Sequence, residues 1–326
     1  MLRDFDKRDF ADSFELCRRA AQMHQRVAVV IPTLNEAATI GEIVNRLRQQ
    51  WMIQHPLLEA IHVIDSGSED DTLTQAAAAG ATTHLAATIA PEHGHYAGKG
   101  ENLWKAQFVC DADIICCIDG DIRDFDAEFI AGLVGPLLWH PELHFIKAHY
   151  RRPLEHERGI SESGGGRVSK ILMRPLLSLL YPELCSFFQP LAGEFALRRE
   201  LMHQLSFPVG YGIEIAHLID LCRHWGLSRC AQSNLGVRRH RHQSDAELGR
   251  MAFSLLRTCL ERAERDGKMQ FAEQLSEHFL AKQVGEHSLA IHPMVLTTTE
   301  RPPFAKISSS SNSWHATSPQ TESEVH

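Results

Sequence analysis

The sequence predicts an α/β fold, in which a Rossmann-like nucleotide-binding half with a mainly parallel sheet is followed by a helix-rich half. Short apolar runs of strand length alternate with segments whose apolar residues recur at helical spacing, a pattern typical of right-handed βαβ units. Polar residues directly follow three of these runs, and the carboxyl ends of parallel strands share one edge of a sheet. No Gly-x-Gly-x-x-Gly loop follows the first run, which disfavours a dinucleotide cofactor.

Strands are predicted in short segments that are rich in β-branched and other apolar residues. They cover residues 27–31, 60–64, 113–118 and 143–150, with strand-like stretches at 187–195 and 230–238. Helices are predicted where apolar residues recur every three or four positions. They cover residues 40–47, 70–80, 98–108, 126–139, 168–181, 196–204, 213–225 and 245–265. Residues 86–98, with Pro91 and two glycines, predict a loop over the site.

The composition of the chain changes along its length. Residues 1–26 are polar with only a weak helical period, so we expect an appendage outside the sheet. Residues 27–150 form the nucleotide-binding half, and the Arg-Arg-Pro at 151–153 begins a second half that extends to residue 296. Ser, Thr and Pro are frequent in residues 297–326, which are expected to be disordered.

The overall composition excludes several classes of protein. Hydrophobic residues make up 44% of the 326 residues and charged residues 23%, as in ordinary globular proteins. A net charge of −8 argues against nucleic-acid or anionic-membrane partners. No apolar stretch approaches the roughly 20 residues of a membrane span, and no signal-peptide segment opens the chain. Eight cysteines without Cys-x-x-Cys spacing fit a reducing compartment, so we expect a cytoplasmic protein with no membrane or nucleic-acid partner.

The central motif is Asp119-Gly120-Asp121, which directly follows the apolar run 114–118. Alternate residues of an extended segment lie on one face, so both carboxylates can reach a single divalent cation. Such a cation would neutralise the diphosphate of a sugar nucleotide and stabilise its departure. Acidic residues at strand ends are also common in solvated turns, so the tripeptide alone does not establish a metal site.

Two other strand ends carry polar residues. Pro32-Thr33-Leu34-Asn35-Glu36 follows the first strand, and Asp65-Ser66 ends the second. Each has a structural interpretation as a turn and helix start, where Asn, Asp and Glu satisfy free backbone amides. Each also suits a cradle for a nucleoside, with Asp65 placed to bind ribose or base groups. Polar groups at three strand ends favour one common crevice.

Two glycine-flanked segments begin predicted helices. Lys99 in Gly98-Lys99-Gly100 is either an exposed lysine at a flexible helix start or a contact to a phosphate or to sugar hydroxyls. Glu214, which follows Gly210-Tyr211-Gly212-Ile213, either complements the helix dipole or binds sugar or acceptor hydroxyls.

Two further segments carry basic residues. Gly166-Arg167-Val168-Ser169 follows two more glycines and is either a linker or a site for the acid groups of an acceptor. Arg238 begins an Arg-Arg-His-Arg-His cluster in which His240 could complete a metal shell while arginines hold acid groups. A nucleic-acid patch is disfavoured because no further basic stripe accompanies the cluster.

Ten stretches between residues 27 and 260 resemble glucosyl-3-phosphoglycerate synthases, which are retaining glycosyltransferases of the GT-A fold. They are VVIPTLNEAATIG, VIDSGSEDDT, GKGENLW, IDGD, VGPLL, IKAHYRRPL, GGGRVSKILMRPLL, PELCSFFQPLAGEFALRREL, FPVGYGIEI and NLGVRRHRH. YRRPL, GGGRV, QPLAGE and GYGIE together are far more specific than a D-x-D motif.

The resemblance implies transfer of glucose from UDP-glucose to the 2-hydroxyl of 3-phosphoglycerate, with Mg²⁺ or Mn²⁺ and a homodimeric chain. Residues 151–296 would then be the acceptor-binding half. In the mechanism that it implies, UDP departs and a phosphate oxygen takes the acceptor's proton, so no protein base is needed.

The resemblance, carried over motif by motif onto this sequence, implies the following site together with the polar residues described above. The catalytic residues are Asp119, Asp121, Glu214 and Lys99. Donor contacts are Pro32, Thr33, Leu34, Glu36, Asp65, Ser66, Lys99, Asp119, Gly120, Leu191, Ala192, Gly193, Tyr211, Glu214 and Arg238. Acceptor contacts are Gly166, Arg167, Val168, Ser169 and His242, and the metal ligands are Asp121 and His240.

Several alternatives remain open at this point. Ser169 and His242 stand where the family usually has Thr and Asn, so another small acid acceptor is possible. GDP-mannose or ADP-glucose could replace UDP-glucose as the donor. Outside glycosyl transfer, a nucleotidyltransferase would want a glycine-rich loop after the first strand, and a sugar-nucleotide sensor would need no acceptor site.

Overall fold

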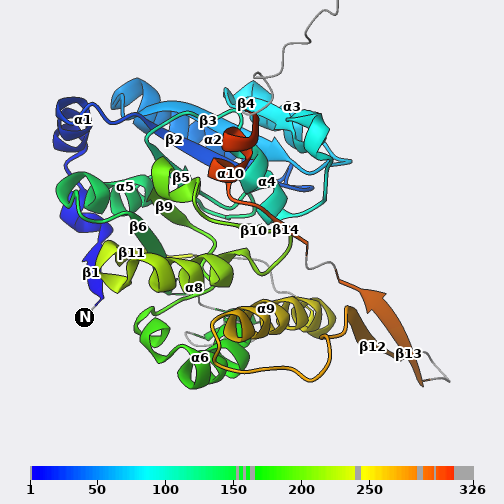
Figure 1. Cartoon of the computed structure of the whole chain (residues 1–326). Coiled ribbons are helices and arrows are strands. Elements are labelled where there is room, and N and C mark those ends of the chain that lie inside the picture. Colours follow the sequence, from blue (N-terminus) through cyan, green and yellow to red (C-terminus); the bar gives the residue numbers. More distant parts are fainter. Residues whose placement is uncertain are drawn as a thin grey trace, which may run out of the picture.

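A mixed eight-stranded sheet runs through the computed structural model, which describes residues 2–151, 154–156, 159–161, 166–238, 244–284, 289–296 and 299–311 (Figure 1). Its strand order is β1-β11-β6-β9-β5-β2-β3-β4. The strands are β1 (Arg3–Asp6), β2 (Val27–Thr33), β3 (Leu58–Asp65), β4 (Thr82–Leu85), β5 (Ile114–Cys117), β6 (Phe145–Arg151), β9 (Phe195–Arg198) and β11 (Cys230–Val237). Only β9 pairs antiparallel with its neighbours, so the predicted mainly parallel sheet is confirmed.

Helices cover both faces of the sheet. The face of Val29 packs against α1 (Ser13–Gln22), α2 (Ile40–Arg48) and α5 (Phe129–Trp139). The face of Val30 packs against α4 (Lys99–Ala106), α6 (Arg174–Leu180), α8 (Ile213–Trp225) and α9 (Asp245–Arg265). All seven residues of β2 are buried, which explains its uninterrupted apolar sequence.

Smaller elements complete the described chain. The other helices are α3 (Thr72–Ala79), α7 (Arg199–Met202) and α10 (Phe304–Ser311), and short helical turns are η1 (Lys7–Phe10), η2 (Gln49–Gln54), η3 (Ala86–Thr88), η4 (Pro91–His93), η5 (Ser169–Met173), η6 (Pro182–Ser186) and η7 (Leu227–Arg229). Three strand pairs lie outside the main sheet: β7 (Leu154–His156) with β8 (Gly159–Ser161), β10 (Phe207–Pro208) with β14 (Glu300–Arg301), and β12 (His278–Val284) with β13 (Leu289–Val295). None of the described helices is long and apolar enough to span a membrane.

The helix predicted over 245–265 is α9, and side-chain hydrogen bonds at Ser244 explain why it begins at Asp245. Ser244 Oγ accepts from the Glu247 amide at 3.3 Å, and Glu247 Oε2 accepts from the Ser244 amide at 2.7 Å. This reciprocal capping box satisfies two backbone amides that a helix start leaves without partners.

The N-terminal expectation is wrong. β1 pairs parallel with β11 along Arg3–Asp6, so part of residues 1–26 is an edge strand of the sheet and no outside appendage. Asn234 of β11 donates to Asp6 Oδ2 at 3.0 Å and adds a side-chain link to the strand pairing.

Two expectations for later segments also need correction. Residues 299–311, expected to be disordered, contain β14 and α10, and Arg301 is only 8% exposed. The helix predicted over 196–204 begins as strand β9, because its apolar residues pair with both β5 and β6, and only Arg199–Met202 are helical. The strand-like stretch 187–195 is irregular until its last residue.

The topology brings distant residues to one edge of the sheet. Asp65, Asp119 and Arg238 lie at or just beyond the carboxyl ends of parallel strands. Because β9 runs the other way, its amino end lies at this same edge, and Glu194 directly precedes it. In open α/β sheets this edge is where ligands bind.

His217 of α8 gives the fold a pH-dependent stability. Its ring lies 4.7 Å from the Phe207 ring, centroid to centroid, and Nε2 is 3.2 Å from the Ser206 carbonyl oxygen. Burial lowers the pKa of His217 to about 3 from an ordinary value of 6.5. Between these values the unfolded chain binds the extra proton, so the free energy of unfolding decreases as pH falls.

We expect His217→Phe to remove this contribution. Urea unfolding of the wild type should lose about 2 kcal/mol more than that of the variant between pH 7 and pH 5, because each pH unit below 6.5 contributes about 1.4 kcal/mol. Parallel pH dependence in the two proteins would show that His217 is not neutral in the folded state.

Candidate active site

Six polar side chains form one cluster at the carboxyl edge of the sheet. Asp119 follows β5, Tyr150 belongs to β6, Glu194 precedes β9 and Arg238 follows β11. Lys99 is the first residue of α4, and Glu214 lies in the first turn of α8. The cluster therefore joins residues from both sides of the boundary predicted near residue 150.

Lys99 bridges two carboxylates. Its Nζ donates to Asp119 Oδ1 at 2.5 Å, to Glu214 Oε1 at 2.8 Å and to the Gly193 carbonyl oxygen at 3.2 Å. Burial opposes its charge, but Asp119 and Glu214 raise the pKa of Lys99 above its ordinary value. The three bonds use the whole donor capacity of the ammonium group, so the side chain has a fixed position.

Arg238 joins the two carboxylates of the Asp-Gly-Asp motif. Its Nη2 lies 3.1 Å from Asp119 Oδ2 and 2.8 Å from Asp121 Oδ1. On its other side, Nη1 donates to Tyr150 Oη at 2.8 Å and forms an ion pair with Glu194 Oε1 at 2.9 Å. Tyr150 Oη in turn donates to Glu194 Oε2 at 2.8 Å. The guanidinium is thus held by a buried tyrosine and a fully buried carboxylate.

The charges of the cluster suit a divalent cation. Burial opposes ionisation of Asp119, but Lys99 and Arg238 hold the pKa of its carboxyl below its ordinary range. Four carboxylates form ion pairs with Lys99 and Arg238 here, and the buried Lys147 interacts electrostatically with three of them, so one negative charge is uncompensated when all these groups are ionised. Asp121 retains 48% exposure of its side chain, and carboxylate oxygens are the ligands that Mg²⁺ and Mn²⁺ prefer.

The second predicted metal ligand, His240, lies outside the described residues. Within the part of the chain that the structure describes, no group of three or more His, Cys, Asp or Glu side chains could hold a metal. Arg238 Nη2 lies between one carboxylate oxygen of Asp119 and one of Asp121, so the two carboxylates of the motif lie close together.

Glycines allow close approach at two points of the cluster. A Cβ on Gly193 would lie 2.0 Å from Asp119 Oδ2. A Cβ on Gly98 would lie 2.2 Å from the Val209 carbonyl oxygen, and one on Gly100 would lie 1.8 Å from that of Pro208. The glycines that flank Lys99 therefore pack the start of α4 against the backbone that leads to Glu214, which explains the Gly-Lys-Gly spacing.

The predicted nucleoside contacts divide into exposed and buried residues. Leu34 is 49% exposed, and Glu36 and Ser66 are half-buried. Thr33 Oγ1 donates to Asp65 Oδ2 at 2.8 Å, and both side chains are buried.

The expectation that the Asp65 side chain binds a nucleoside directly does not fit this structure. Its oxygens also accept from the Gly67 and Ser68 amides at 2.8 and 2.7 Å and from Ser68 Oγ at 2.6 Å. Asp65 has no exposed surface, so its carboxylate shapes the turn after β3.

The predicted acceptor residues lie elsewhere in the second half. Gly166, with φ of +74°, precedes the turn η5, and Lys170 donates its amide to the Gly166 carbonyl at 3.0 Å. Arg167 Nη1 donates to Asp245 Oδ1 at 2.6 Å, at the first residue of α9. Val168 and Ser169 are half-buried at the start of η5, and His242 lies outside the described residues.

The remaining predicted donor residues lie around the cluster. Gly120 has no side chain, and its carbonyl oxygen accepts a hydrogen bond from Thr39 Oγ1 at 2.6 Å. Ala192 is buried, Leu191 is half-buried, and Tyr211 is 53% exposed beside Glu214 in sequence. Pro32 is buried within β2.

Two cluster residues and one residue beside the cluster were not expected from the sequence. Glu194 and Tyr150 fix Arg238, and Asn102 of α4 donates to the Ile64 carbonyl oxygen at 2.8 Å and accepts from Ser66 Oγ at 2.9 Å. All three stand inside stretches that carry the family resemblance, but only Glu194 carried a local signal, a lone acid between glycine and an apolar strand.

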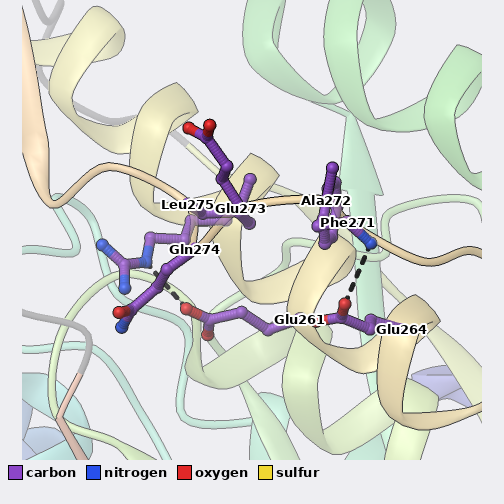
Figure 2. Close-up of a pocket in the computed structure, with 8 residues that line it drawn as sticks. Glu261, Glu264, Phe271, Ala272, Glu273, Gln274 and Leu275 are labelled. Carbon is purple, nitrogen blue, oxygen red and sulfur yellow. Dashed lines mark hydrogen bonds and ion pairs between the residues drawn. The ribbon is translucent and has the colours of Figure 1, made fainter.

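A hollow beside α9 is a separate feature. It measures about 410 Å³ and lies between α9 and residues 271–275 (Figure 2). Glu264 Oε1 accepts from the Phe271 amide at 3.0 Å, and Arg257 Nε donates to Glu261 Oε1 at 2.7 Å. None of the predicted site residues lines this hollow.

A mixed sheet with paired carboxylates at its carboxyl edge is the architecture of GT-A glycosyltransferases, and residues 28–187 match the glycosyl transferase family 2. A glucosyl-3-phosphoglycerate synthase from Petrotoga mobilis is 41% identical over 307 residues, which cover 94% of each chain. The chain therefore belongs to the glucosyl-3-phosphoglycerate synthase family and is a hexosyltransferase.

Two solved structures share the fold of this chain. Mannosyl-3-phosphoglycerate synthase from Rubrobacter xylanophilus has a TM-score of 0.87 and 34% identity, covering 94% of this chain and 97% of that one. Glucosyl-3-phosphoglycerate synthase from Mycobacterium tuberculosis, with Mn²⁺, UDP-glucose and phosphoglyceric acid, has a TM-score of 0.81 and 35% identity, covering 94% and 99%. The same M. tuberculosis protein has also been crystallised with Mg²⁺ and UDP.

Proposed function

We propose that this protein transfers glucose from UDP-glucose to the 2-hydroxyl of 3-phosphoglycerate and yields glucosyl-3-phosphoglycerate with retained anomeric configuration. The observation that carries the proposal is the shared cluster, in which Lys99 and Arg238 hold the Asp119 carboxylate between the two halves of the chain. Family membership at 41% identity over 94% of each chain supports the donor and the acceptor.

Asp121, with His240, would hold Mg²⁺ or Mn²⁺. When bound, the metal supplies positive charge that stabilises the departing diphosphate. Lys99 fixes Asp119 and Glu214 relative to each other, so both carboxylates are preorganised for the hydroxyls of the sugar. Arg238 contributes a cation whose position is set by Tyr150 and Glu194.

In the reaction, the bond between the anomeric carbon and the β-phosphate oxygen breaks, and the acceptor 2-hydroxyl oxygen bonds to the anomeric carbon on the same face. The hydroxyl proton passes to the β-phosphate oxygen of UDP, so charges and atoms balance without a protein base. The role of the cluster is then to orient both substrates and to stabilise the charge that develops on separation.

Binding roles follow from exposure. Leu34, Glu36 and Ser66 would contact the uridine, while Thr33 and Asp65 shape the crevice beneath it. Leu191, Ala192 and Gly193 would line the glucose pocket with Tyr211. Arg167 and Ser169, with Gly166, Val168 and His242, would hold the acid groups of the acceptor, because amides and a guanidinium suit phosphate and carboxylate.

The decisive test is a mass-spectrometric assay of the purified full chain with Mg²⁺, UDP-, GDP- and ADP-sugars and 3-phosphoglycerate. A phosphorylated hexosyl-glycerate that forms fastest with UDP-glucose is expected, and nuclear magnetic resonance of the product would give its anomeric configuration. Nucleotide release without this product would point to another small acid acceptor. Inactivity with every donor would favour a sugar-nucleotide sensor.

Mannosyl transfer to phosphoglycerate is a second candidate, favoured by the TM-score of 0.87 to the Rubrobacter xylanophilus enzyme. The 41% identity to the Petrotoga mobilis protein favours glucose over mannose. The same assay separates the two candidates, because product formation fastest with GDP-mannose would support the second.

We also propose that the chain is a cytoplasmic homodimer. All eight cysteines are free, which fits a reducing compartment. The β12–β13 hairpin extends away from the rest of the chain (Figure 1). The pairing places Leu280 and Val295 on the same face as Ile291, and these side chains are 63%, 63% and 69% exposed. An exposed apolar face of this kind favours contact with a second copy of the chain.

A double variant tests the dimer. The wild type is expected to show twice the chain mass in size-exclusion chromatography with light scattering. Combined Leu280→Glu and Ile291→Glu substitutions should give the monomer mass, because two charges would be desolvated at the contact. His292→Glu, on the opposite face of the hairpin, is the matched control and should remain dimeric. A monomeric wild type, or a dimeric double variant, would refute this contact.

A further inference from the structure

A C-terminal strap, residues 299–305, crosses the outer side of α4. It begins with an antiparallel pairing between β14 and β10, and the Val209 amide donates to the Thr299 carbonyl oxygen at 3.0 Å. Farther along, the Trp104 indole donates to the Pro302 carbonyl oxygen at 2.9 Å. Figure 1 shows β14 and α10 beside β10 and α4. The hairpin of β12 and β13, which precedes the strap in the sequence, extends away from them.

Arg301 is the centre of the strap. Its Nε and Nη2 each lie 2.7 Å from a carboxylate oxygen of Glu101, which has no exposed surface. Its Nη1 donates to the His93 carbonyl oxygen at 2.7 Å, and Nη2 donates to that of Gly94 at 3.2 Å. The guanidinium also lies 4.6 Å from the ring centroid of Trp104 and 4.7 Å from that of Tyr96. Arg301 thus ties α4 to the loop that precedes it.

Helix α4 connects this arginine to the catalytic cluster. Glu101 is two residues from Lys99, whose ammonium contacts Asp119 and Glu214. Asn102, the next residue, holds the ends of β2 and β3 through the Thr33 and Ile64 carbonyl oxygens. A rotation of α4 would therefore displace the donor crevice and the cluster together.

The strap also holds the backbone that leads to Glu214. β14 pairs with Phe207 and Pro208, and the carbonyl oxygens of Pro208 and Val209 lie where only glycine fits on α4. The strap thus contacts both supports of the Lys99–Glu214 pair, α4 and the segment before α8. A substitution that loosens it would change the relative position of the two residues.

We infer that the C-terminal strap positions the donor site, and that Arg301 is the positioning residue that locks α4 and residues 207–210 in register. The inference rests on the proposed function for its ligand, a nucleoside diphosphate with a divalent cation. Arg301 touches no reacting atom; it acts through Glu101 and Lys99.

Arg301→Lys is the sharpest test, because lysine keeps the charge but has no planar fork to serve Glu101 and two carbonyl oxygens at once. We expect the dissociation constant of UDP with Mn²⁺ to rise about tenfold by calorimetry and turnover to fall about tenfold, since small misplacements are costly in preorganised sites. The KM for 3-phosphoglycerate should stay within about twofold, because the acceptor contacts lie outside α4. Hydrogen exchange should increase in peptides that cover 91–104 and 207–214.

Arg257→Lys is the matched control. Arg257 is also buried in the structure, holds Glu261 at 2.7 Å and donates to the Ser276 carbonyl oxygen at 2.9 Å, but it lies beside the separate hollow. The Arg257→Lys substitution should lower the thermal stability of the protein without changing its affinity for UDP. If Arg301→Lys lowers stability in the same way with unchanged UDP affinity, the strap is only structural and the inference is wrong.

Two further readouts keep the outcome clear. If Arg301→Lys does not fold, Glu101→Gln loosens the same pair from α4 and must weaken UDP binding, or the inference fails. If the wild type transfers no sugar, the proposed function fails, while hydrogen exchange still tests the strap. Unchanged exchange at 207–214 in Arg301→Lys would overturn the inference whatever the activity.

Discussion

Asp121→Asn is expected to lower turnover with Mg²⁺ and UDP-glucose by about 10³-fold, because in the proposed site the substitution would remove one of the charges that hold the cation at the leaving diphosphate. The Asp121 side chain is 48% exposed, and its described ion-pair partner is Arg238, so it is the carboxylate of the pair most open to a metal. Asp119 is instead held by Lys99 as well as by Arg238. Mn²⁺ binding, followed by electron paramagnetic resonance, should weaken in parallel with turnover.

The control for this prediction stands at the other end of the same strand. Asp111 precedes β5, pairs with Arg26 and has a side chain that is 80% exposed. Asp111→Asn should leave turnover and Mn²⁺ affinity near the wild-type values, because surface pairs contribute little. Near-normal turnover of Asp121→Asn with Mg²⁺ would remove Asp121 from the metal site.

Gly193→Ala is expected to lower kcat/KM by at least about 10²-fold, since a small displacement of a preorganised group has effects of that size. The added Cβ would lie 2.0 Å from Asp119 Oδ2 and 2.5 Å from its Cγ, far inside contact distance. Asp119 cannot yield easily because Lys99 and Arg238 hold it from two sides. Gly193 does not have a positive φ, so the expected effect comes from the steric clash of the added Cβ and not from backbone conformation.

Gly41→Ala is the matched control for a glycine substitution. Its Cβ would lie 3.6 Å from the nearest atom, Gln75 Oε1, which is ordinary contact, and its position in α2 favours alanine. Kinetic constants like those of the wild type are expected for this variant. If Gly193→Ala is equally active, Asp119 is free to move and is not preorganised.

Most of the sheet could be predicted from the sequence because its central strands are buried on both faces. β2 and β5 contain uninterrupted apolar runs, β3 is interrupted only by Glu59 and His62 before its final acid, and the helix that follows β2 has regular apolar spacing. β1 could not be found in this way, because Arg-Asp-Phe-Asp is a short and charged edge strand whose partner β11 lies near the other end of the chain. β9 was predicted as part of a helix, because no sequence pattern marks an antiparallel strand that lies between two parallel strands.

The site was predicted to a similar extent. Asp119, Asp121, Lys99, Glu214 and Arg238 were all expected, and the structure brings them together. Glu194 and Tyr150 were not, because their contact depends on how β6, β9 and β11 lie beside one another. The ion pair of Arg301 was not predicted, because the segment from residue 297 onward is rich in serine and threonine and its composition gives no sign of a single buried ion pair.

The position of β9 limits how this fold can be recombined. It lies between β5 and β6, so the chain beyond residue 150 supplies the strand that joins two strands from before it. A chain cut near residue 150 would leave β5 with an open edge and β6 without either of its sheet neighbours. Acceptor preference therefore cannot be exchanged between relatives by swapping whole halves as modules. It has to be transplanted loop by loop onto an intact sheet.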